Sequence, residues 1–108
     1  MNEHIVRGTD ASLLVDFTDN PDGITVQDVT AVSFTTKQRA AKNVYSLSDF
    51  TIVGNALQFN WTQEMTFALK AGEKLKLEMD IVAKGKCSRL AGIPKQVDVW
   101  DSERSEVL

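Results

Sequence analysis

Strict alternation between apolar and polar side chains over residues 74–84 constrains the fold of this chain more than any other feature. The apolar side chains on one parity are Leu75, Leu77, Met79, Ile81 and Ala83. The other parity is charged at every position except Val82. A helix would scatter the apolar positions around its circumference, whereas a strand places them all on one face. The segment therefore predicts a long β-strand with one buried face and one solvated face.

Weaker copies of the same period of two occur along the rest of the chain. They lie around Leu13–Phe17, Val32–Phe34, Leu57–Trp61 and Val97–Val99. β-Branched and aromatic side chains are frequent in them, and the alternation is typical of antiparallel strands with one buried face. Trp61 shares its parity with the apolar positions of its segment, so we expect it in the core. Trp100 shares its parity with a polar position and is predicted to be exposed.

Turn signals separate these segments. Asn20-Pro21-Asp22-Gly23 is typical of a type I turn, and Gly54-Asn55 of a short hairpin. Pro94 lacks an N–H group and predicts an edge or a bulge in the last strand. We expect one short helical turn near Thr62–Phe67, capped by Thr62, between two sheets. With about seven strands and no long helix, the pattern predicts an all-β protein, an antiparallel β-sandwich.

Composition bounds the chemistry that this chain can perform. Its 108 residues fit a single domain, residues 1–108, in which Asp101–Leu108 is expected to form a C-terminal tail. One cysteine and one histidine exclude an internal disulfide and a thiolate metal site, and they leave little imidazole chemistry. A net charge of −3 disfavours a nucleic-acid partner, because such partners are bound by neutralising phosphates.

The sequence contains no signal for secretion or membrane insertion. Residues 1–8 lack a basic region followed by an apolar run, so we expect no signal peptide. No apolar stretch approaches the roughly 20 residues that span a bilayer. We therefore expect no membrane partner and synthesis in a reducing cytoplasm, where a free Cys87 is tolerated.

Candidate chemical groups each have a simpler structural explanation. His4 has no partner at a recognised spacing, and a general base needs one. Cys87 follows Lys84-Gly85-Lys86, where positive charge could activate the thiol, but a small residue at a strand bend is favoured. The three carboxylates Asp16, Asp19 and Asp22 could crowd around Ca²⁺, yet the EF-hand spacing fails and turn chemistry explains the segment.

We therefore expect no catalytic, metal or cofactor-binding residue, and no enzyme. The basic run Lys37–Lys42, followed by Tyr45, could contact a phosphate group, but a solvated loop is favoured. Trp100 remains a candidate for a protein interface, for cover of a sheet edge, or for a sugar platform. Val107 and Leu108 are two apolar residues at the end of the tail, after a polar segment that is expected to be solvated. These three residues, Trp100, Val107 and Leu108, are the possible interface, with the tail expected to dock on a partner rather than on its own core.

Several segments taken together resemble a known family. They are His4–Asp10, which leads into an apolar strand, then Thr30–Phe34, Trp61–Leu69 with its continuation to Gly72, and Val97–Trp100 before a short tail. This arrangement resembles the small immunoglobulin-like β-sandwich proteins of tailed phages and gut-bacterial prophages. It is also similar to the N-terminal domain of baseplate upper proteins. The most specific part is the stretch from Thr62 to Gly72.

The resemblance implies a non-enzymatic structural protein of the virion. Expected locations are the capsid surface, a head fibre, or the tail and baseplate, after synthesis in the cytoplasm of the host bacterium. Expected partners are other virion proteins or further copies of the chain in a homo-oligomer. Such proteins often carry Gln-x-Arg in the long strand, where this chain has Leu77-Glu78-Met79-Asp80. The alternative is a carbohydrate-binding module that uses Trp100, Tyr45 or another exposed aromatic as a platform for glycans.

Overall fold

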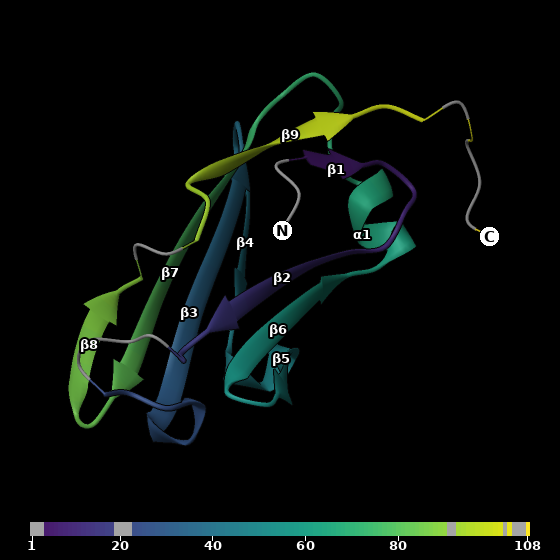
Figure 1. Ribbon diagram of the computed structural model, residues 1–108. Coiled ribbons are helices and arrows are strands. Elements are labelled where there is room, and N and C mark those ends of the chain that lie inside the picture. The colour runs from purple at the N-terminus through teal and green to yellow at the C-terminus, as the bar shows by residue number, and fades with distance from the viewer. Residues whose placement is uncertain (1–3, 19–22, 91–92, 103, 105–107) are drawn as a thin grey trace.

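The computed structural model describes residues 4–18, 23–90, 93–102, 104 and 108 of the chain. Two sheets pack against each other in these residues, which confirms the predicted all-β sandwich (Figure 1). The strands are β1 (His4–Val6), β2 (Ala11–Asp16), β3 (Val29–Gln38), β4 (Ala41–Tyr45), β5 (Phe50–Val53), β6 (Ala56–Trp61), β7 (Leu75–Ala83), β8 (Lys86–Arg89) and β9 (Gln96–Trp100). The helical elements are η1 (Val26–Asp28), η2 (Leu47–Asp49) and α1 (Gln63–Phe67). The described residues thus hold more strands than predicted, because β1, β4 and β8 are too short or too exposed to alternate visibly. β5 was expected as one arm of the hairpin at Gly54.

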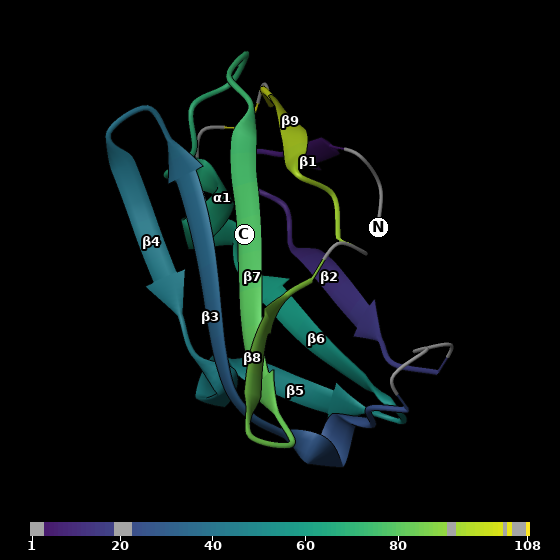
Figure 2. The same cartoon turned by 90° about the vertical axis from the view of Figure 1, so that its left-hand side faces the viewer.

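The order of the strands is that of an immunoglobulin-like sandwich. Such folds hold strands B, E and D in one sheet and C, F and G, often with C′, in the other. Here β2, β6 and β5 form the first sheet, in the order β2-β6-β5. The second sheet has the order β1-β9-β7-β3-β4, with β8 added beside β7 (Figures 1 and 2). Lettered along the chain, β3, β4, β7 and β9 take the places of C, C′, F and G.

One pairing differs from the antiparallel expectation. β1 runs parallel to β9, with His4 opposite Asp98 and Val6 opposite Trp100. Parallel pairing requires a long connection between the two strands, and here almost the whole chain lies between them. The sequence could not reveal this pairing, because three residues are too few for a period to show.

The long alternating segment forms the central strand of the larger sheet. β7 pairs with β3 along most of its length, with Val32 opposite Ile81 and Phe34 opposite Met79. The five apolar positions of residues 75–83 are all buried, as predicted. This strand therefore supplies the floor of the hydrophobic core, which the three-stranded sheet covers.

An aromatic cluster fills the middle of the sandwich. The ring of Phe34 lies 5.0 Å from that of Phe59 and 6.0 Å from that of Trp61, in edge-to-face arrangements. Phe59 and Trp61 are 4.8 Å apart, and all three side chains are buried. Each such pair contributes about 0.5–1.5 kcal/mol beyond the area it buries. The predicted core position of Trp61 is confirmed.

The predicted turns are found where the structure describes them. Thr62 caps α1, because its Oγ1 accepts a hydrogen bond from the Met65 amide at 3.3 Å. Gly54, with φ of +59°, joins β5 to β6 in the expected hairpin. Pro94 lies between β8 and β9, which both pair with β7, so the last strand is interrupted as expected. Asn20, Pro21 and Asp22 of the predicted type I turn lie outside the described residues.

Candidate functional site

The outer face of the three-stranded sheet carries almost no charge. Its side chains are Ser12, Leu14 and Asp16 from β2, Ala56, Gln58 and Asn60 from β6, and Thr51 and Val53 from β5. Asp16, at one corner, is the only ionisable group of this set. Leu14 is 52% exposed and Val53 is 47% exposed, although both are apolar. We call these eight residues the neutral face.

The edge beside the neutral face is open. β5 pairs with β6 on one side and with no other described strand, so its outer N–H and C=O groups are free to pair. None of its four residues is charged, and Ile52 is 60% exposed. Native proteins usually blunt such edges with charges or proline, and β5 has neither.

The outer face of the larger sheet is charged and internally paired. The guanidinium of Arg89 contacts Glu78 at 2.5 Å and Asp80 at 2.9 Å. Lys74 contacts Asp98 at 2.9 Å. The hydrogen bond from Arg89 lowers the pKa of Asp80, so this carboxyl stays ionised well into acid. The outer face of the larger sheet is therefore charged, whereas the neutral face of the smaller sheet carries almost no charge.

Three lysines form an exception to this pairing. Lys37 lies directly opposite Lys42 on one side and Lys76 on the other, so a row of ammonium groups crosses β4, β3 and β7. Among the described residues no carboxylate forms an ion pair with any of them. We call these residues the lysine row. The sequence predicted a solvated loop here; instead β3 and β4 continue to a tight turn at Arg39, whose φ is +51°.

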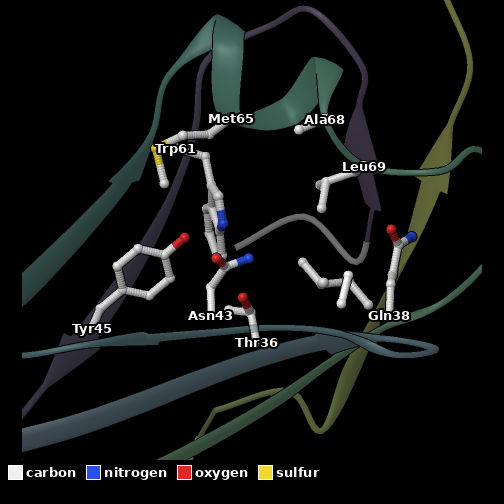
Figure 3. A pocket seen from close by; sticks show the side chains of 10 residues that line it. Thr36, Gln38, Asn43, Tyr45, Trp61, Met65, Ala68 and Leu69 are labelled. Carbon is white, nitrogen blue, oxygen red and sulfur yellow. The ribbon is translucent and has the colours of Figure 1, made fainter.

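A pocket of about 180 Å³ opens beneath α1, between the two sheets (Figure 3). Asn43 and Tyr45 of β4 and Thr36 of β3 line one wall, and Trp61 and Met65 lie across from them. Burial raises the pKa of the Tyr45 hydroxyl above its ordinary value. The ring of Tyr45 packs 4.6 Å from that of Phe59, so this residue faces the pocket and is not a surface platform.

Gln38 closes one end of this pocket and was missed by the sequence analysis. Its Nε2 donates to the carbonyls of Lys70 and Glu73 at 2.9 and 3.1 Å, and its Oε1 accepts from the Lys70 amide at 2.8 Å. The amide is buried and fully satisfied, so it ties β3 to the loop before β7. Gln38 occupies an inward-facing position in the alternation of β3, which was the available signal. Its polar side chain argued against burial.

Trp100 is exposed as predicted, at 53% of its surface. The ring of His4 stacks on it at 3.8 Å and 9°, because parallel pairing brings β1 beside β9. One face of the indole is therefore covered by its own chain. The sequence showed no partner for His4 at a recognised catalytic spacing, and this stacking contact is a structural one.

The described part of the C-terminal tail contacts its own domain. The guanidinium of Arg104 lies 5.4 Å from the ring of Phe67 and donates to the Gly8 carbonyl. The Leu108 amide donates to Oε1 of Gln63 at 2.8 Å, while the Leu108 side chain is 84% exposed. Arg104 thus contacts an aromatic face and a carbonyl of its own domain, while the docking of the tail on a partner stays a prediction. Val107 lies outside the described residues.

The remaining candidate groups do not come together. Cys87 is an exposed free thiol in the middle of β8. Asp16 accepts hydrogen bonds from the Thr18 amide and hydroxyl, which lower the pKa of its carboxyl. Asp19 and Asp22 lie outside the described residues, and within those residues no cluster of three metal-ligating side chains occurs. No helix of the described chain is long and apolar enough to cross a membrane.

Comparisons with known proteins add no relative. No protein-family model matches the chain, and a search of curated proteins finds no match.

Proposed function

We propose that this chain is a non-enzymatic structural subunit that acts by assembly with other protein chains. One observation carries the proposal: the neutral face and the open β5 edge adjoin one another and together expose Leu14, Ile52 and Val53. Exposed apolar side chains beside an unpaired strand edge mark sites where proteins associate. The lettered strand order of an immunoglobulin-like sandwich is a common scaffold for such surfaces.

A second copy of the chain is the occupant that suits this surface. Two-fold symmetry would place β5 antiparallel to β5 of the second copy and join the two three-stranded sheets into one. In such an interface each residue meets the same patch on the other copy, so charged residues would repel their equivalents. β5 is uncharged and avoids this repulsion. The β4 edge, which carries Lys42, does not avoid it.

The size of the surface sets the strength of the association. Three strands of about five residues span roughly 250 Å² at ordinary strand spacing and rise. Stable dimers bury about 800 Å² on each partner. A single contact of this kind is therefore weak, and it gains strength where many copies or partners are held together, as in a virion.

Sedimentation of the purified chain tests this association. We expect the average mass to rise above the 12.0 kDa monomer as the concentration approaches about 1 mM. The double variant Ile52→Lys with Val53→Lys should remain monomeric, because it places charge on β5 of both copies at the two-fold contact. Ser33→Lys, on the outer face of the larger sheet, is the matched control. A wild-type chain that stays monomeric, or a control that dissociates equally, contradicts the proposal.

The virion is the proposed location of this assembly. Its support is the resemblance of residues 4–10, 30–34, 61–72 and 97–100 to the immunoglobulin-like proteins of tailed phages and prophages. Mass spectrometry of purified phage particles, released by cells that carry the gene, tests it. We expect the chain in a fixed ratio to the major capsid protein. Its absence from washed particles would remove this part of the proposal and leave the association itself intact.

A carbohydrate-binding module is the second candidate, and the half-exposed indole of Trp100 favours it. Because His4 covers one ring face, a sugar would stack on the other. Glycan binding that is lost in Trp100→Ala and kept in His4→Ala would support this function. Equal binding by the wild type and Trp100→Ala would exclude Trp100 as the platform.

A further inference from the structure

The lysine row is the least compensated feature of the described surface. Like charges directly opposite one another destabilise a sheet, and here two such pairs are adjacent. The chain has an excess of acidic residues, yet among those described none pairs with Lys37, Lys42 or Lys76. Anionic groups brought from outside the chain would relieve this repulsion.

The row ends at an open strand. β4 lies at the border of the larger sheet and pairs with β3 alone among the described strands (Figure 2). Its residues alternate between two environments. Lys42 and Val44 belong to the outer face, while Ala41, Asn43 and Tyr45 line the pocket beneath α1 (Figure 3). A strand added beside β4 would therefore meet cations on one face and the pocket on the other.

We propose that β4 binds an extended acidic segment of a partner protein as an additional strand. Neighbouring strands lie about 4.8 Å apart, so an Asp or Glu opposite Lys42 would continue the lysine row with the opposite charge. The next side chain along the segment would point into the pocket. The favoured segment thus alternates acidic and apolar residues, and main-chain hydrogen bonds to β4 supply affinity.

The pocket fits one apolar side chain of such a segment. A cavity of about 150 Å³ holds a benzene ring, and this pocket measures about 180 Å³. Trp61, Met65 and Leu69 offer apolar contact, and the hydroxyl of Tyr45 and amide of Asn43 lie near the entrance strand. This site is on a different edge from β5 and does not depend on self-association there. Lysine on an edge strand also discourages pairing with an identical basic edge, which favours a foreign strand over a second copy.

A synthetic peptide tests the proposal with the whole chain. The probe is an acetylated, amidated heptapeptide of the sequence Thr-Glu-Leu-Glu-Val-Glu-Thr, and the readout is the shift of backbone amide resonances during titration. We expect the largest shifts in residues 41–45 and in the pocket residue Trp61. Lys42→Glu should weaken binding about tenfold, because attraction becomes repulsion. Lys86→Glu, an equal change of charge on exposed β8, should leave binding unchanged.

Two further peptides separate strand pairing from simple charge attraction. The same peptide with Lys in place of Glu should fail to bind the wild type and should bind Lys42→Glu. A peptide N-methylated at alternate residues keeps its charges but loses main-chain donors, so it should bind at least tenfold more weakly. Absence of binding by the acidic peptide overturns the proposal. Equal binding of the methylated peptide, or equal weakening by Lys86→Glu, overturns it as well.

Discussion

At the scale of single residues, Gly8 is held by a close contact as well as by its backbone. Its φ is +82°, and a Cβ added there would lie 2.4 Å from Cζ of Phe67. The ring of Phe67 in turn lies within 5.9 Å of the Arg7 guanidinium and 5.4 Å of the Arg104 guanidinium. The junction between β1, α1 and the tail therefore depends on the absence of a side chain at residue 8.

Gly8→Ala should lower the free energy of unfolding by about 2–5 kcal/mol, which combines left-handed strain with overpacking. Gly72→Ala is the matched control, because Gly72 has φ of +79° and nothing within 4 Å of an added Cβ. It should lose about 1–2 kcal/mol from strain alone. Urea denaturation measures both values. Equal losses would show that the Phe67 ring moves aside without cost.

Thr66 satisfies the buried backbone of the same junction. Its Oγ1 accepts a hydrogen bond from the Gly8 amide at 2.9 Å and donates to the Thr9 carbonyl at 2.9 Å. Thr66→Val keeps the shape but leaves the Gly8 N–H unpaired, so we expect a loss of about 1–3 kcal/mol and faster exchange of the Gly8 amide. Thr66→Ser keeps the hydroxyl and should keep the slow exchange. Slow exchange in both variants would contradict this account.

Such contacts could not be predicted from the sequence, because their partners are distant along the chain. Residue 8 meets residue 67, and His4 meets Trp100, only after the sheets have formed. The exposure of Trp100 and the burial of Trp61 were predictable, since each follows from parity within its own strand. The alternation within a strand does not indicate which distant residue will pack against an aromatic ring.

At the scale of elements, a charged pair links the two strands of the hairpin formed by β7 and β8. Arg89 on β8 donates to both oxygens of Asp80 on β7, at 2.9 and 3.2 Å. This bond is the main cause of the lowered pKa of Asp80. A carboxyl whose pKa is lower in the folded state stabilises the fold above its unfolded pKa, near 3.9, and ceases to do so as the pH falls through the folded value.

Arg89→Ala should therefore raise the pKa of Asp80 toward its ordinary value and lower stability near pH 7. As the pH falls through the lowered pKa of Asp80, the variant and the wild type should come to differ much less, because Asp80 is then protonated in both states. Carbon-13 titration of the Asp80 carboxyl and urea denaturation across this range measure the two effects. Lys86→Ala on the same strand is the control. An unchanged pKa in Arg89→Ala would exclude Arg89 as its cause.

Elements with a buried face were predictable, and elements without one were not. β7 and β6 alternate between core and solvent, so their period was visible. The residues of β8 are all exposed, and four of the five in β4 are exposed, so no period marks them as strands. Of the two proposed binding edges, β4 belongs to this second kind, whereas β5 was indicated by the hairpin signal at Gly54-Asn55 and not by its own alternation.

At the scale of the whole molecule, the two sheets of the sandwich expose different surfaces. The larger sheet carries paired charges and the lysine row, while the smaller sheet carries the neutral face. The sandwich class followed from the alternation, but this division did not, because it depends on which strands share a sheet. We propose that the chain functions by joining its β5 edge, at the border of the neutral face, to that of a further copy.

Amide hydrogen exchange, compared between dilute and concentrated chain, tests that claim most directly. An edge amide that pairs with another copy exchanges more slowly, whereas an edge amide in a monomer is open to water. We predict that the β5 amides of residues 50–53 that point away from β6 exchange more slowly in concentrated solution, while those of β4 do not change. The Ile52→Lys and Val53→Lys double variant should lose this difference. Exchange at β5 that is independent of concentration in the wild type would contradict the account.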